Sequence, residues 1–370
     1  PLQIPAIDMI EIGAGGGSIA RVDQRGLLQV GPDSAGADPG PVCYGRGNKL
    51  PTVTDCDLVL GYLAEGSFLG GRMRLDKAAA EQAIEEHLAK PLGISVVEAA
   101  WGVLETVTAN MAQAATIHAI ERALDVTRFA MLPIGGAGPV HACSMAAKMN
   151  LDRLICPTGA GVASAIGMLA SAISFEIARA SPGSLDRLDF ARTQSMIEDM
   201  DAEASALVTG AGVDAGVVSR RLSVMMRYIG QGYEIETPVL AQIIGDADRD
   251  GLLAAFTRAY QRRYGRSENM PVEILSWRLA VEGPRSALGE SLVARKIDGT
   301  ADGQPVGSRQ AWFDDHFIET PVYRRADLAP GTEIKGPAII EETESTTILP
   351  PEFDLSIDRA LNLVLTREKR

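Results

Sequence analysis

The stretch Glu11-Ile12-Gly13-Ala14-Gly15-Gly16-Gly17-Ser18-Ile19-Ala20 gives the first indication of the fold. It places four glycines within five positions, between the alternating apolar segment 9–12 and a second apolar segment. Glycine accepts positive φ and lets a ligand approach the backbone closely. Successive exposed N–H groups in such a turn form a concavity that suits phosphate. The stretch therefore predicts a phosphate-binding turn between two strands, and a hairpin that only reverses the chain is the alternative.

This glycine turn matches neither of two familiar phosphate-binding motifs. It is not a P-loop, because no Gly-Lys-Ser/Thr follows the glycines. It is not a dinucleotide fingerprint either, because Ser18 stands where the third glycine belongs and the residues that follow indicate strand rather than helix. Ser18 has two possible roles, a hydrogen bond to a phosphate oxygen or stabilisation of the turn itself.

Composition limits the class of protein. A chain of 370 residues can hold two or three domains with a large core. The net charge of −13 argues against nucleic acid and anionic lipid as partners. The chain has no run of 18 apolar residues, no basic segment at its start and no CxxC pair, so we expect a cytoplasmic protein with buried free thiols and no membrane span. The first residue is Pro1, which indicates processing or excision from a longer chain.

Two further glycine turns each precede a predicted helix. A buried strand over 129–134 is expected to lead into Gly135-Gly136-Ala137-Gly138 and a helix over 140–149. A strand over 154–157 leads into a small-residue turn and helix over 159–167. N–H groups at a helix N-terminus favour an anion or a polar ligand edge. Together the three turns predict an α/β domain with a cleft that can hold a nucleotide.

Several polar residues near the first turn are candidates for ligand contacts. The loop 31–47 is rich in glycine and proline and carries Asp38; it either wraps a ligand or is an ordered surface loop. In an extended segment Asp55 and Asp57 would face one side, which suits a hard cation, whereas at a helix start Thr54 or Asp55 would be the N-cap. We favour the cap. His141, one turn into the predicted helix, either reaches a ligand or caps local backbone.

The remaining pattern divides the chain into four parts. Residues 1–180 form the α/β domain, with a helix capped by Asp76 and a long helix that begins with the capping box of Ser95 and Glu98. Residues 181–287 form an α+β domain, after a junction at Ser181-Pro182-Gly183, with helices over 190–210 and 251–264, a hairpin joining 224–229 to 233–237, and a strand over 272–281. Residues 288–309 are a linker, and 310–370 form a small β-rich domain.

Six of these motifs, in this order, resemble the hydantoinase A/oxoprolinase family. That family includes ATP-dependent N-methylhydantoinase, 5-oxoprolinase and the ATP-using subunits of acetone and acetophenone carboxylases. The resemblance runs nearly end to end and rests on Ile12 to Ala20, Val30 to Tyr44, Thr54-Asp55, Gly135 to His141, Met226 to Gln231, and Gly336 to Glu341. It implies an ATPase similar to actin, sugar kinases and heat-shock chaperones, with this chain holding the second half of the ATPase domain.

The resemblance also implies site residues. Gly13 to Ser18 match the second phosphate loop and Gly135 to Gly138 the adenosine loop, for ATP with Mg²⁺ or Mn²⁺. The implied nucleotide-binding residues are Gly13, Gly15, Gly16, Gly17, Ser18, Gly135, Gly136, Ala137 and Gly138. Asp38 and His141 are the candidate catalytic residues, and Asp55 is the candidate metal ligand. The chain departs from the family in lacking the first phosphate loop, and its helix around 256–264 has no histidine.

The implied activity is ATP-dependent hydrolysis of a cyclic amide, of the hydantoin or 5-oxoproline type, through a phosphorylated intermediate. The alternatives are a ketone carboxylase subunit, or a non-catalytic fragment that binds nucleotide only with a partner chain. The family implies a hydantoinase B-type companion subunit and an oligomer.

Overall fold

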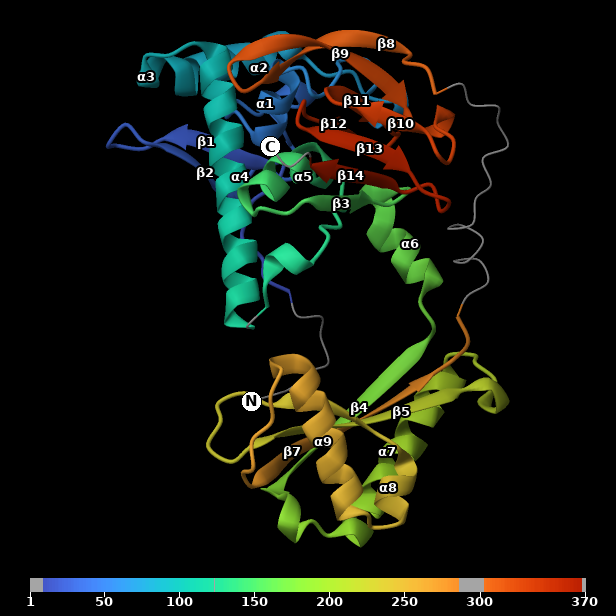
Figure 1. Cartoon of the computed structure of the whole chain (residues 1–370). Helices are drawn as coiled ribbons and strands as arrows, with labels where there is room; N and C mark the ends of the chain where they lie inside the picture. The colour runs from blue at the N-terminus through green and yellow to red at the C-terminus, as the bar shows by residue number, and fades with distance from the viewer. Residues whose placement is uncertain (1–8, 123, 286–302, 368–370) are drawn as a thin grey trace. The chain divides into compact units, whose positions relative to one another are not determined.

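The computed structural model of the chain describes residues 9–122, 124–285 and 303–367, which are drawn in colour in Figure 1. The described residues divide into two compact units. Of the described residues, one unit, the glycine-turn unit, combines 10–168 with 303–367, and the other, the central unit, comprises 169–285 together with Met9. Both mix helices and sheets, which confirms the predicted α/β class.

The first glycine turn precedes a hairpin. Strands β1 (Ser18–Val22) and β2 (Leu28–Ser34) pair antiparallel, and Gly26 between them has φ +79°. The expected strand over 9–12 is wrong. Met9 is 70% exposed, and the segment forms no strand with any described residue. The turn therefore does not lie between two strands.

Helices α1 (Val53–Val59), α2 (Lys77–Ile84) and α4 (Val96–Glu121) form the helical part of the glycine-turn unit (Figure 1). The side chain of Asp76 caps α2, and Ser95 and Glu98 form the predicted capping box at the start of α4. Helix α4 packs against α1 and α5 (Gly138–Lys148). Its N-terminal half contributes Ala99, Val103 and Val107 to a core that also holds Leu58 and Leu60 from the α1 region.

The capping box of α4 gives a first prediction. In Ser95→Ala, the N–H of Glu98 loses its acceptor, so the free energy of unfolding should fall by about 1 kcal/mol. Denaturant titration would measure the loss. Ser67→Ala is the matched control, because the Ser67 hydroxyl caps no helix N–H and its removal should change stability by less than about 0.5 kcal/mol.

The predicted separate domain over 310–370 is wrong, because its strands complete the glycine-turn unit. One sheet has the order β10 (Glu333–Lys335), β13 (Phe353–Ile357), β14 (Leu363–Arg367), β3 (Arg153–Cys156). Another has the order β12 (Thr346–Leu349), β11 (Ala338–Glu341), β9 (His316–Arg324), β8 (Gly307–Phe313). Ala311 and Phe313 are buried in the same core as α1 and α4, so these strands have no separate core.

Contacts in the backbone show how closely the C-terminal strands join the N-terminal segment. The N–H of Trp312 donates to the carbonyl of Leu60 at 2.9 Å, and the Tyr62 hydroxyl donates to the carbonyl of Trp312 at 2.7 Å. The end of the predicted linker, 307–309, belongs to β8 (Gly307–Phe313), and residues 288–302 of that linker lie outside the described residues.

The second and third glycine turns lie where expected, but the prediction of a buried strand before the second turn is wrong. Residues 129–134 make only one bridge, Met131 to Leu154, and Phe129, Leu132 and Ile134 are exposed. Helix α5 follows the second turn, and α6 (Ala163–Ala170) follows the third. All four cysteines are buried and free, as predicted.

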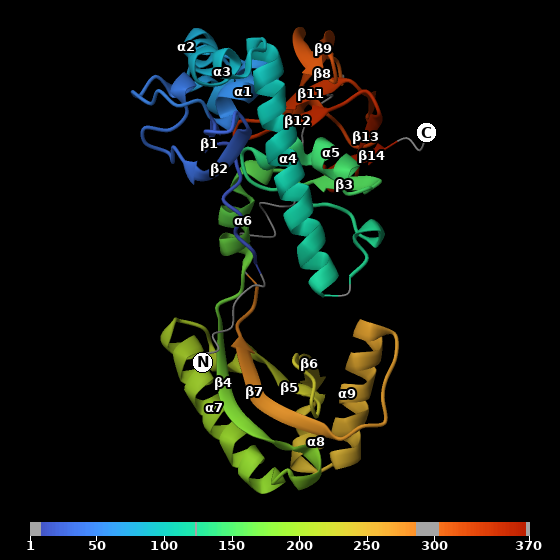
Figure 2. The ribbon, with the colours of Figure 1, turned by 90° about the vertical axis from the view of Figure 1, so that its left-hand side faces the viewer.

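The central unit is a four-stranded antiparallel sheet with two long helices. The sheet has the order β4 (Ser174–Ser184), β7 (Val272–Glu282), β5 (Ser219–Tyr228), β6 (Ile235–Val239). Helix α7 (Phe190–Gly210) lies along β4 and β7, and α9 (Arg249–Tyr264) along β6 (Figure 2). The short helix α8 (Ala241–Gly245) connects β6 to α9. The predicted helices and hairpin are confirmed.

The predicted junction in Ser181-Pro182-Gly183 falls inside β4. The register shift between Ala180 and Gly183 accommodates the proline as a bulge in a strand at the edge of the sheet. The compact central unit accordingly begins at Leu169, twelve residues before the predicted boundary at 181.

No single described helix is long and apolar enough to cross a membrane; one pair, Lys77–Leu92 with Val96–Glu121, meets the length and composition criteria together but is bent by 86°.

Candidate functional site

A cavity of about 310 Å³ lies within the glycine-turn unit and brings two of the glycine turns together. Gly16 and Gly17 line it from the first turn, and Gly136 and Ala137 from the second. The third wall is the segment 341–346, which connects β11 to β12. Apolar side chains on its surface include Tyr44, Leu63, Phe68 and Val140. Segments more than 300 residues apart in sequence therefore share one cavity.

The backbone of both turns offers free hydrogen-bond donors. The N–H groups of Gly16, Gly17, Gly136 and Ala137 donate to no other described residue. The neighbouring N–H groups are engaged: Gly15 donates to Ser18 Oγ and Gly135 donates to the carbonyl of Ala160. Free N–H groups in a concave turn are suited to phosphate oxygens.

Glycine is sterically required at the first turn. A Cβ on Gly16 would lie 2.7 Å from Thr54 Oγ1 and 3.4 Å from the Cβ of Ala137. A Cβ on Gly17 would lie 2.9 Å from Ser34 Oγ. Gly16 thus lies against both α1 and the second glycine turn, and a side chain there would occupy the space between the two turns.

Helix α1 holds the first turn in place. Both the N–H and the hydroxyl of Thr54 donate to the carbonyl of Gly16, each at 2.9 Å. In Thr54→Val the hydroxyl bond is lost at nearly constant side-chain volume, and ligand affinity should fall about 5- to 10-fold because one hydrogen bond contributes about 1 kcal/mol. Calorimetry of ATP binding would measure this. Thr366→Val, on β14, is the control and should leave affinity unchanged.

The structure gives Asp55 a structural role. Its carboxylate accepts from the N–H groups of Val42, Cys43 and Thr52 at 3.1, 2.7 and 2.8 Å, and it is fully buried. The N-cap of α1 is Thr52, and Asp55 closes the capping box, so the cap predicted at Thr54 or Asp55 lies two or three residues too late. Both oxygens already accept hydrogen bonds, which leaves the predicted metal ligand without support.

Asp57 and His141 are two buried polar residues that lie next to each other in this region. His141 Nε2 lies 3.5 Å from Asp57 Oδ2, and both side chains are less than 5% exposed. Asp57 lines the cavity, and neither its Oδ1 nor His141 Nε2 has a hydrogen-bond partner among the described residues. Because α1 is a helix, Asp55 and Asp57 point about 200° apart, so the favoured helix start is confirmed and the extended alternative, in which both would face one side, is wrong.

The other predicted site residues do not line the cavity. Ser18 is buried, and its hydroxyl donates to the carbonyl of Gly13 at 3.2 Å, so it stabilises the turn. Asp38 is exposed on the loop after β2, although Gly36 and Pro41 on either side of it reach the cavity. The predicted glycines that lie outside the lining are Gly13, Gly15, Gly135 and Gly138.

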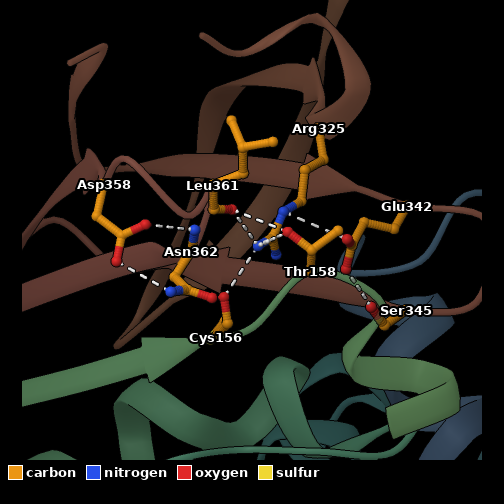
Figure 3. A network of polar contacts seen from close by, with 8 residues as sticks. All are labelled: Cys156, Thr158, Arg325, Glu342, Ser345, Asp358, Leu361 and Asn362. Carbon is orange, nitrogen blue, oxygen red and sulfur yellow. Dashed lines mark hydrogen bonds and ion pairs between the residues drawn. The ribbon is translucent and has the colours of Figure 1, made fainter. Parts of the chain in front are cut away.

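The buried Arg325 forms an ion pair with Glu342 in the wall 341–346 (Figure 3). Arg325 Nε lies 3.3 Å from Glu342 Oε1, and Ser345 Oγ donates to Glu342 Oε2 at 2.7 Å. Arg325 Nη2 also donates to the carbonyls of Cys156 and Leu361, at 2.9 and 2.8 Å. Burial lowers the pKa of the Arg325 guanidinium, and the charge of Glu342 opposes that shift.

Glycines also allow this wall to approach the turns. A Cβ on Gly161 would lie 2.4 Å from the carbonyl oxygen of Glu344, and one on Gly136 would lie 3.3 Å from the same atom. Sequence reasoning did not connect the segment 341–346 with the site. The only sequence signal was its place among the six motifs, since the preceding residues 336–341 form one of them.

Comparison with known proteins identifies the family. The Hydantoinase/oxoprolinase family matches residues 1–177, and the Hydantoinase/oxoprolinase C-terminal domain matches residues 189–367. The chain belongs to the hydantoinase/oxoprolinase family. The predicted resemblance is therefore confirmed.

Named relatives within the family differ in what they act on. The chain is 34% identical to caprolactamase subunit alpha of Pseudomonas jessenii, over 99% of this chain and 53% of that protein. It is 32% identical to the acetophenone carboxylase gamma subunit of Aromatoleum aromaticum, over 96% of this chain and 50% of that protein. The chain thus spans about half the length of the curated relatives it matches.

Solved structures support the fold. The ATP-dependent caprolactamase of Pseudomonas jessenii matches with a TM-score of 0.76 and 33% identity, over 97% of this chain and 52% of that one. Nucleotide-free acetone carboxylase matches with a TM-score of 0.76 and 27% identity, over 96% of this chain and 52% of that one. An actin-like ATPase fold is consistent with this family.

The described residues fit a nucleotide better than a protein-held metal. The free N–H groups of both turns suit phosphate oxygens. No three His, Cys, Asp or Glu side chains in the described parts of the chain come together around a point that could hold a metal ion. The predicted metal site therefore has no described ligand set.

Proposed function

We propose that this chain is the part of an ATP-dependent enzyme that binds nucleotide phosphates between two glycine turns, and that the enzyme hydrolyses a cyclic amide. The observation that carries the proposal is the cavity lined by Gly16, Gly17, Gly136 and Ala137, whose N–H groups donate to no described residue. The names of the caprolactamase relative and of its solved structure support both ATP and an amide substrate.

The chemistry assigned to the chain is positioning and charge stabilisation. ATP supplies the phosphoryl group that makes a carbonyl oxygen a better leaving group. The turn amides would donate hydrogen bonds to phosphate oxygens. These amides need no reorganisation during the reaction, because Thr54 already fixes the Gly16 carbonyl. Leu63, Phe68 and Val140 would exclude water from one side of the cavity. Asp38, which is exposed and does not line the cavity, has no proposed part in this step.

The substrate and the assembly are part of the same proposal. A hydantoin, 5-oxoproline or another lactam is the proposed substrate class, and a ketone is the second candidate because acetophenone and acetone carboxylases are relatives. Since relatives carry the names of alpha, beta and gamma subunits, we propose a hydantoinase B-type companion subunit, an oligomer and a cytoplasmic location.

The test has two stages. Calorimetry of this chain with ATP and inorganic triphosphate should give binding of both, and failure of both to bind would contradict the proposal. The longer protein, combined with a companion subunit, should then release ADP and phosphate only when a substrate is added. Turnover with a lactam and not with acetophenone or acetone supports the amide proposal, and the reverse supports the carboxylase.

A further inference from the structure

The pair of Asp57 and His141 is the one buried polar feature of the cavity region that lacks hydrogen bonds to the described residues. Asp57 Oδ1 and His141 Nε2 are both buried and without a partner. Two other polar side chains that line the cavity are engaged, since Thr54 donates to Gly16, and Ser345 donates to Glu342. An unsatisfied buried carboxylate oxygen is costly, so a native structure is expected to supply a partner for it.

The pair connects the two elements that carry the glycine turns. Asp57 comes from α1, which Thr54 ties to Gly16. His141 comes from the first turns of α5, which begins directly after Ala137. Asp57 itself lines the cavity, so a molecule bound between the turns lies within reach of its carboxylate.

The chemistry of the carboxylate selects the part of the ligand that can face it. A carboxylate accepts hydrogen bonds and carries negative charge, so it repels phosphate oxygens. The phosphates are expected at the free turn amides, and a group bearing an O–H or N–H is expected at Asp57. In a nucleotide these donors are the ribose hydroxyls and the exocyclic amino group of the base. The apolar residues Leu63, Phe68 and Val140 suit a base or sugar face.

We propose that Asp57 and His141 recognise a hydrogen-bond donor on the nucleoside part of the bound nucleotide and thereby set nucleotide specificity. Asp57 Oδ1 accepts from the donor, while His141, whose Nε2 lies 3.5 Å from the other carboxylate oxygen and which does not itself line the cavity, orients Asp57. This inference rests on the proposed function, because it assumes that the ligand is a nucleotide.

The first experiment uses the unaltered chain. Calorimetry would compare ATP with 2′-deoxy-ATP, 3′-deoxy-ATP and the purine riboside triphosphate that lacks the 6-amino group, with inorganic triphosphate as the probe of the phosphate contacts alone. At least one of the three analogues should bind about 10-fold or more weakly than ATP, since a hydrogen bond to a charged group is being lost. The analogue affected identifies the donor. Three analogues within about twofold of ATP would overturn the inference while leaving the proposed function intact.

The second experiment asks whether Asp57 is the acceptor. Asp57→Asn should weaken ATP binding about 10-fold, yet change the affinity for the sensitive analogue and for triphosphate by less than about twofold, because the contact is already absent there. Equal losses for ATP and the analogue would overturn the assignment. If the unaltered chain binds triphosphate but not ATP, the nucleoside inference fails and the phosphate contacts stand; if it binds neither, both proposals fail.

Asp55→Asn provides the matched control for this variant. The same substitution then lies on the same helix at a fully buried carboxylate that bonds only protein groups. It should lower thermal stability while keeping the ratio of ATP to analogue affinity. A changed ratio in Asp55→Asn would show that general damage to α1, and not the Asp57 contact, produces the discrimination.

Discussion

Replacing Gly16 with valine is expected to abolish nucleotide binding. The new Cβ would lie 2.7 Å from Thr54 Oγ1 and 3.4 Å from the Cβ of Ala137, so the Thr54 side chain, which holds the Gly16 carbonyl, or the first turn itself must shift. The shift removes the convergence of two pairs of turn amides on one ligand. Since each hydrogen bond to a charged group contributes about 1.5–3 kcal/mol, loss of two should reduce ATP affinity more than about 100-fold.

Gly15→Val is the matched control for Gly16→Val. A Cβ on Gly15 meets no atom within 4 Å, and Gly15 does not line the cavity. Its ATP affinity should therefore stay within about threefold of that of the unaltered chain. Circular dichroism would establish that both variants are folded, and calorimetry would measure binding. Unchanged affinity in a folded Gly16→Val variant would remove the first turn from the proposed site.

The sequence predicted the parts of the site that depend on local backbone. Gly16, Gly17 and Gly136 line the cavity, and neighbouring groups leave little room for a side chain at these positions. A run of glycines in the sequence indicates such positions directly. The start of α1 was predicted nearly correctly, because threonine and aspartate are typical of helix starts. The error of two or three residues arose because Thr52 and Asp55 form the capping box, at the spacing that this motif requires.

The wall formed by 341–346 and the availability of Asp57 could not be predicted in this way. Both depend on contacts between distant segments. The short apolar run at the end of β8, Ala311 to Phe313, gives no local sign that Phe313 packs in the core with Leu58. Asp55 and Asp57 are chemically alike, and only the backbone around α1 shows that one is fully hydrogen-bonded and the other has a free oxygen.

Replacing Arg325 with methionine is expected to lower the free energy of unfolding by about 3 kcal/mol, because a carboxylate that is only 13% exposed loses its cation. Arg325 is 6% exposed and is the cation that faces Glu342 in Figure 3. The carbonyls of Cys156 and Leu361 would also lose their donor. Arg324→Met is the control on the adjacent residue. Its partner Asp327 and Arg324 itself are both more than 40% exposed, so the loss should stay below about 1 kcal/mol.

A second substitution separates the ion pair from the packing of the arginine. If unpaired charge on Glu342 causes most of the loss, adding Glu342→Gln to Arg325→Met should recover at least about 1 kcal/mol, because a neutral amide is less costly to bury than a carboxylate. Denaturant unfolding followed by tryptophan fluorescence would give the four free energies, provided that the glycine-turn unit unfolds in one transition. Strictly additive losses would place the effect on the carbonyl contacts instead. Since Glu342 lines the cavity and Arg325 does not, a folded Arg325→Met chain should also bind ATP more weakly, which links the C-terminal strands to the proposed site.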